Sequence, residues 1–145
     1  MVITEVTDGR EQYWELMLDA DPSREMVKKY LNHGFMLVAT EAGDTVGEII
    51  TVPISASVWE IKNLSIDASY QKEGYGTALV LSAVSRLPEG TELLVGTSDS
   101  GVEFYEKCGF HYFRTEPDFF TENYPEPIFE NGAQCVDMIY LKRMV

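Results

Sequence analysis

The sequence predicts a single α/β domain over residues 1–145, with a mixed central sheet flanked by about four helices. Short β-branched runs alternate with longer segments whose apolar residues recur at helical spacing. One such run, Val58–Ile66, is followed by a glycine loop, a helical pattern and a second run, Glu92–Gly96. A crossover helix joins parallel strands, so we expect these two strands to be parallel.

The N-terminal part is expected to supply three strands and two helices. Asp8 and Glu11 have the spacing of a capping box, which predicts the start of the first helix. Asp21-Pro22 is a start signal for the second helix, and Gly34 is expected to end it. The strands are predicted over Met1–Val6, Phe35–Thr40 and Thr45–Val52, with the last two forming a hairpin.

The C-terminal part is expected to add two helices and two strands. Leu79, Val80 and Leu87 belong to the apolar stripe of the first of these helices. Ser100 and Glu103 predict a capping box for the second helix. Strands are predicted over Phe110–Arg114 and Cys135–Leu141, and residues 115–134 are expected to be irregular.

The net charge of the chain indicates which classes of binding partner are expected. The chain has 24 acidic and 11 basic residues and a net charge of −13, which argues against nucleic acid and anionic membranes. A cationic partner such as an amine is more natural, and the alternative is an acidic surface that serves only solubility. The two cysteines and two histidines do not have the spacing of a disulfide framework or a metal site, so no metal is expected. No leader or membrane span is recognisable, so cytoplasmic localisation is the default.

The segment Gln71–Thr77 is the strongest functional signal. Gly74 and Gly76 lie between a strand and a helix start, where free backbone N–H groups and the helix dipole favour phosphate. The Lys-Ser/Thr of a P-loop and the third glycine of a dinucleotide fingerprint are both absent. A different phosphate-bearing ligand is therefore indicated.

The pattern Gln-x-x-Gly-x-Gly resembles the acetyl-CoA pyrophosphate loop of the GNAT superfamily of N-acyltransferases. Leu64–Asp67 resembles the end of that family's fourth strand, and Phe104–Phe110 resembles its fourth helix and the turn after it. The resemblance implies the GNAT fold, with a mostly antiparallel sheet in which parallel strands four and five splay apart. Acetyl-CoA, as the acyl donor, is expected in the opening.

The same resemblance implies which residues contact acetyl-CoA. Backbone groups of the fourth strand are expected to bind the pantetheine arm of acetyl-CoA, and the glycine loop is expected to bind its pyrophosphate. Polar residues at the end of the fifth strand are expected to contact the pantetheine arm as well. Glu73 departs from the family pattern, which often has a basic or small residue at this position. A carboxylate beside pyrophosphate weakens binding unless it points to water. The predicted residues are Leu64, Ser65, Ile66, Gln71, Lys72, Glu73, Gly74, Tyr75, Gly76, Thr77, Ser98 and Asp99.

Two catalytic residues are predicted from the family positions that they match. Tyr105 is expected to protonate the departing thiolate, which requires concerted transfer or a lowered phenol pKa. Glu60 is expected to act as the general base that deprotonates the amine. The structural alternatives are a core aromatic for Tyr105 and, for Glu60, a solvated carboxylate beside Lys62.

The predicted function is acetyl transfer from acetyl-CoA to a small-molecule or peptide primary amine by direct attack in a ternary complex. The alternative is a non-catalytic acyl-CoA sensor or interaction module with the same fold. The segment Phe119–Pro127 carries aromatics with Glu122 and Glu126, and either shapes the acceptor pocket or packs on the sheet or on a second subunit. A homodimer through the last strands is left open.

Overall fold

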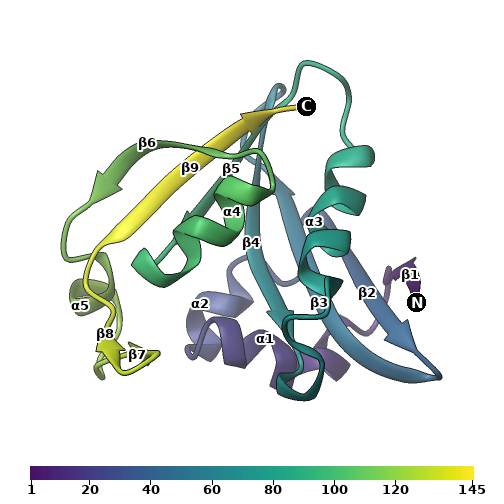
Figure 1. The fold of residues 1–145 in the computed structure, drawn as a ribbon, viewed down its shortest axis with the longest axis horizontal. Helices are drawn as coiled ribbons and strands as arrows, with labels where there is room; N and C mark the ends of the chain where they lie inside the picture. The colour runs from purple at the N-terminus through teal and green to yellow at the C-terminus, as the bar shows by residue number, and fades with distance from the viewer.

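The computed structural model describes residues 1–145, in which one seven-stranded sheet forms the framework (Figure 1). Its strand order is β1-β2-β3-β4-β5-β9-β6. The strands are β1 (Val2–Glu5), β2 (Phe35–Glu41), β3 (Asp44–Pro53), β4 (Val58–Ile66), β5 (Glu92–Thr97), β6 (His111–Glu116) and β9 (Met138–Met144). A separate hairpin pairs β7 (Phe129–Glu130) with β8 (Ala133–Gln134).

Only one pair of neighbouring strands in the sheet is parallel. β4 and β5 run in the same direction, and every other pair is antiparallel. The predicted mixed, mostly antiparallel sheet with parallel fourth and fifth strands is therefore confirmed.

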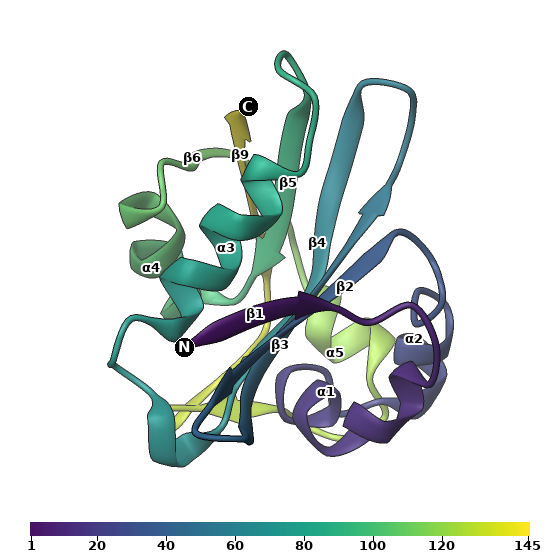
Figure 2. The same ribbon diagram turned by 90° about the vertical axis from the view of Figure 1, so that its right-hand side faces the viewer.

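Helices cover both faces of the sheet (Figure 2). Five α-helices are present: α1 (Trp14–Ala20), α2 (Arg24–Lys28), α3 (Tyr75–Ser85), α4 (Val102–Lys107) and α5 (Phe119–Asn123). Short 3-10 turns precede three of the elements: η1 (Arg10–Tyr13), η2 (Ala68–Tyr70) and η3 (Asp99–Gly101). α3 and α4 lie on one face, and α1 and α2 lie on the other. None of these helices has the length and apolar character needed to cross a membrane.

Two hydrophobic clusters correspond to these two faces. The larger has 15 buried residues, including Leu79 of α3, Tyr105 of α4 and Leu93 of β5. The smaller has 8 buried residues, including Met17 of α1 and Val27 of α2. The sheet therefore separates a large core from a small one, and burial of apolar side chains stabilises each.

A β-bulge in β4 changes which residues face each core. Thr51 pairs with Ile61, but the preceding residue, Ile50, pairs with Asn63, so Lys62 has no partner on β3. Ile61 and Leu64 both pack in or against the larger cluster. The Asn63 side chain lies on the opposite face and donates a hydrogen bond to the Met17 carbonyl of α1. The bulge thus directs Asn63 toward the smaller core.

Three predicted caps are wrong, and in two of them the side chain, of Asp21 or Ser100, has another partner. The first turn after β1 has Gly9 at its N-cap, with a φ of 68° and no side-chain cap, so Asp8 does not form the predicted box. Ser23, rather than Asp21, caps α2 by accepting a hydrogen bond from the Met26 N–H. The Ser100 hydroxyl bonds elsewhere, and Gly101 lies at the N-cap of α4 without a side-chain cap.

Some predicted boundaries also differ. Residues 115–134 are not wholly irregular, since they contain α5 and the β7–β8 hairpin. The last strand covers 138–144 rather than 135–141, because its partners on β5 extend to Glu92, opposite Met144. Pro53 is the terminal residue of β3 rather than a residue beyond it, as Pro at a strand end does not cost a ladder donor.

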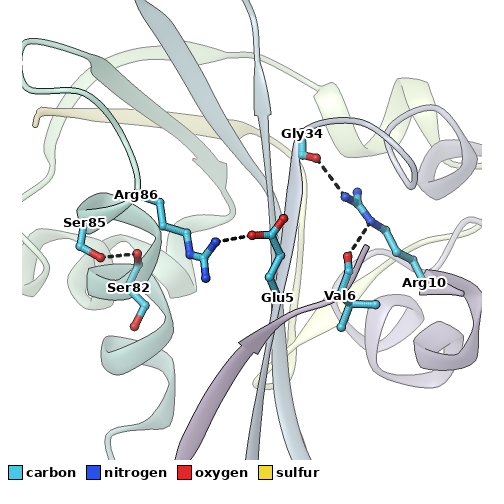
Figure 3. Close-up of polar contacts among 7 residues, drawn as sticks. All are labelled: Glu5, Val6, Arg10, Gly34, Ser82, Ser85 and Arg86. Carbon is cyan, nitrogen blue, oxygen red and sulfur yellow. Dashed lines mark hydrogen bonds and ion pairs between the residues drawn. The ribbon is translucent and has the colours of Figure 1, made fainter. Parts of the chain in front are cut away.

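The buried guanidinium of Arg10 holds the start of the chain against the start of β2 (Figure 3). It donates to the carbonyls of Leu31, His33 and Gly34 at 2.9, 2.8 and 2.9 Å. Its Nε also donates to the Val6 carbonyl at 3.3 Å. Figure 3 also shows the ion pair that joins Glu5 of β1 to Arg86 after α3. These contacts fix β1 and both helical layers relative to one another.

Candidate active site

A cleft opens where β4 and β5 stop pairing. The two strands are hydrogen-bonded only between 58–61 and 92–95, so residues 63–66 of β4 have no partner on β5. The cleft has a volume of about 950 Å³, at the upper end of the size range of ligand pockets. Its wall includes both strands, the start of α3 and α4. Unpaired strand backbone in such a wall is available to a ligand.

Most of the predicted acetyl-CoA residues line this one cleft. These are Leu64, Ser65, Ile66, Gln71, Lys72, Gly74, Tyr75, Gly76 and Thr77. Glu73 does not line it and is exposed, as expected if its carboxylate points to water. Ser98 and Asp99 do not line it either, and instead border an adjoining cavity of about 50 Å³.

The glycine loop forms one end of the cleft through its backbone. Gly74 is the N-cap of α3 with a φ of 91°, a conformation that glycine adopts without strain, and no side chain caps the helix there. The Gln71 amide donates to the Ile66 carbonyl at 3.1 Å and so ties the loop to the end of β4. The uncapped N–H groups and the dipole of this 11-residue helix favour an anion.

Gly76 is needed for a different reason. A Cβ at this position lies 3.2 Å from Cζ of Phe104, closer than an ordinary van der Waals contact. The absence of a side chain lets α3 approach α4, and this brings the loop and Tyr105 to the same cleft.

Tyr105 lines the cleft from α4 and is 8% exposed. The rings of Phe104 and Phe110 pack edge-on against it, with centroids 5.0 and 5.6 Å away. No group of the chain hydrogen-bonds its hydroxyl. Burial is the main reason why the pKa of Tyr105 is raised above its ordinary value, with Cys108, Glu48 and Glu130 contributing. Of the two ways in which a phenol could protonate a thiolate, concerted transfer is favoured, because the environment raises this pKa.

Glu60 lies outside the cleft wall. Its carboxylate pairs with the Lys62 ammonium at 3.1 Å, and 13% of its side chain is exposed. Lys62 itself lines the cleft. The contact with Lys62 agrees with the structural alternative, but the carboxylate is largely buried rather than solvated. The general-base role of Glu60 stays a prediction.

Glu130 is a cleft residue that the sequence did not indicate. It lies on β7 and lines both the main cleft and the adjoining small cavity. The Ser98 and Ser100 hydroxyls donate to its Oε2 at 2.9 and 2.5 Å. Glu122 and Glu126, from the segment expected to shape the acceptor pocket, do not line the cleft. Two-residue strands carry no readable periodicity, so nothing in the sequence pointed to Glu130.

A hydrogen-bond network beneath α1 was also missed, because its members are far apart in the sequence. Asn63 lines the cleft, and its Nδ2 donates to the Met17 carbonyl and the Tyr30 hydroxyl, both at 3.0 Å. The Tyr30 and Tyr124 hydroxyls each donate to Asp21 at 2.8 Å. The network joins β4, the two N-terminal helices and the segment after α5, on the side of the cleft opposite α3.

Glu48 of β3 is buried beside this network without a partner. The side chain is 0% exposed, and no hydrogen bond of normal geometry reaches either carboxylate oxygen. The Ser65 backbone N–H lies near enough to oppose the rise in pKa in part. Glu48 pairs in register with Ser65, and the preceding cleft residue on the same face, Asn63, has an unpartnered Oδ1. Burial raises the pKa of Glu48 to about 8, so its carboxyl group is mostly neutral at pH 7.

An opening between parallel fourth and fifth strands, with an amide-rich helix start at one end, is the arrangement expected of the GNAT acyltransferases. A family model for the acetyltransferase (GNAT) domain matches residues 32–112. The chain belongs to this family, and the predicted GNAT fold and acyltransferase class are confirmed.

Individual relatives cover nearly the whole chain. The uncharacterized N-acetyltransferase YvbK of Bacillus subtilis (strain 168) is 35% identical over 139 residues, which are 92% of this chain and 90% of YvbK. The solved structure of an IAA acetyltransferase from Bacillus cereus ATCC 14579 superposes with a TM-score of 0.89 at 30% identity, covering 99% and 100% of the two chains. A GNAT family acetyltransferase from Elizabethkingia anophelis, solved with acetyl-CoA bound, has a TM-score of 0.89 at 32% identity and coverage of 99% and 97%.

Proposed function

We propose that this protein transfers the acetyl group of acetyl-CoA to a primary amine by direct attack in a ternary complex. The observation that carries the proposal is that the glycine loop and Tyr105 line the same cleft. The acetyl-CoA bound in the Elizabethkingia relative supports the choice of donor. Alignment of two bound substrates supplies much of the acceleration in such reactions.

The donor binds with its diphosphate on the backbone amides of residues 74–77, where the α3 dipole favours negative charge. Its pantetheine arm follows the unpaired backbone of 64–66 between the two strands. Lys72 lines the same end and supplies a positive charge. This arrangement directs the thioester inward, toward Tyr105.

In the chemical step, the neutral amine nitrogen attacks the acyl carbon, and the C–S bond breaks as the new C–N bond forms. Tyr105 donates its phenolic proton to the departing sulfur in the same step. The product nitrogen loses its proton to solvent, and Tyr105 regains a proton from solvent. A concerted transfer avoids a free thiolate beside a phenol whose pKa burial has raised.

The test is thiol release from acetyl-CoA across a panel of primary amines, together with the Tyr105→Phe variant. We expect kcat to fall by about 10²-fold or more, in the range of lost general acid catalysis, with little change in acetyl-CoA affinity. Tyr112→Phe is the matched control, because Tyr112 is 58% exposed on β6 and bonds only Thr115. A protein that binds acetyl-CoA yet releases no thiol with any amine is instead an acyl-CoA sensor.

A further inference from the structure

Glu130 is an exposed acidic residue in the wall of the cleft. It reaches the cleft from the β7–β8 hairpin, which is distant in sequence from the other cleft residues. The Ser98 and Ser100 hydroxyls both donate to Oε2, and Ser98 is itself only 6% exposed. The buried Cys135 thiol lies near the same carboxylate. The two serine hydroxyls therefore hold Oε2, and the exposed side chain leaves Oε1 open to a further donor.

No cation of the chain neutralises this carboxylate. Glu130 takes part in none of the six ion pairs of the structure, although Glu60, which lies outside the cleft, is paired with Lys62. Anchoring the hairpin explains the two serine contacts. The same exposed side chain also places an unpaired negative charge in the cleft wall.

Charge is distributed unevenly along the cleft. Lys72 and the amide-rich start of α3 form the end suited to an anion. Asp19, at the C-terminal end of α1, is the other acidic side chain in the wall besides Glu130. Glu130 is also near enough to the Tyr105 phenol to contribute to its raised pKa. A cation beside Glu130 would therefore occupy the same cleft as the Tyr105 phenol.

We propose that Glu130, held by Ser98 and Ser100, binds an ammonium group of the acceptor and makes the enzyme selective for di- and polycationic amines. The proposal rests on the acetyltransferase function above and names the substrate class. A charge-assisted hydrogen bond from ammonium to Oε1 positions the acceptor, and a second amine of the acceptor attacks the acyl carbon. Neutral or anionic amines lack the group that Glu130 binds.

The test compares 1,5-diaminopentane with 5-amino-1-pentanol, which have the same chain length and differ in one ammonium group. In the native enzyme we expect a KM for the diamine about tenfold lower, with the advantage shrinking as salt is added. Glu130→Gln is expected to raise the KM for the diamine about tenfold and to remove both the preference and its salt dependence. The KM for acetyl-CoA and the melting temperature should change little.

Glu126→Gln is the matched control, because Glu126 is an exposed glutamate of the same segment outside the cleft. It should leave every parameter unchanged. Glu130→Gln with a native diamine preference overturns the inference and leaves the acetyltransferase function standing. A protein that binds acetyl-CoA but acetylates neither amine, nor any other amine of the panel, overturns both. A Glu130→Gln enzyme whose acetyl-CoA KM and diamine KM rise equally also overturns it, because the residue then supports the hairpin only.

Discussion

Replacing Glu48 by glutamine should change how the stability of the fold depends on pH. Glu48 is fully buried and without a hydrogen-bond partner, and its pKa rises from the ordinary value of 4.5 to about 8. The folded protein therefore keeps a proton that the unfolded chain releases. Stability from this group is fully present below the unfolded pKa, and it is lost as the pH rises toward 8.

The magnitude follows from the two pKa values. Between pH 5 and pH 8 the difference in bound protons integrates to roughly 3 kcal/mol, at about 1.4 kcal/mol per pKa unit. A change of this size shifts the melting temperature of a domain of this length by about 10 °C. Glutamine has a similar volume and no proton to lose, so Glu48→Gln should lack this part of the pH dependence.

Urea unfolding of both proteins at pH 5, 6, 7 and 8 measures the effect. The quantity to follow is the difference in unfolding free energy between variant and native protein, because other titrating groups cancel in it. It should move by roughly 3 kcal/mol in favour of Glu48→Gln as the pH rises. Glu126→Gln, at an exposed position, should give a constant difference. Parallel curves for Glu48→Gln and native protein would refute the assignment of a neutral buried carboxyl group.

Three further substitutions test other contacts. Arg10→Met removes the donor to three loop carbonyls and should cost about 2–4 kcal/mol in urea unfolding, whereas the exposed Arg24→Met should cost little. Gly47→Ala places a Cβ 2.9 Å from the Ser65 carbonyl, so we expect a loss of about 1–3 kcal/mol and weaker acetyl-CoA binding by calorimetry. Lys72→Gln should raise the acetyl-CoA KM several-fold and reduce its salt dependence; an unchanged slope against salt contradicts the role given to this cation.

Features encoded by local sequence were predicted correctly. The apolar run 58–66, the glycine loop and the following helix are adjacent in the chain, so their spacing was enough to predict parallel β4 and β5. Tyr105 reaches the cleft because it follows a turn and lies on a helix that packs on the sheet. Each of these inferences needed only a short window of residues.

Features that depend on long-range partners were not predicted. The Ser100 hydroxyl bonds Glu130, 30 residues away, and therefore does not form the cap that its local sequence suggests. The Lys62 bulge arises from the pairing of β4 with β3, which the alternation of β4 alone does not reveal. Glu60 was expected in the site from its offset along the strand, whereas its carboxylate pairs with Lys62 and does not line the cleft.

The sheet separates two cores of unequal size, and substitutions in the two cores should have different effects on the proposed coenzyme site. The 15-residue core holds α3 and α4, whose spacing Gly76 makes possible, so substitutions there disturb the donor end. The 8-residue core beneath α1 and α2 is small, and buried polar atoms of Glu48, Thr51 and Asn63 lack hydrogen-bond partners, so we expect this layer to open first in hydrogen exchange. The larger core around α3 and α4 should therefore stay protected when the layer of α1 and α2 opens.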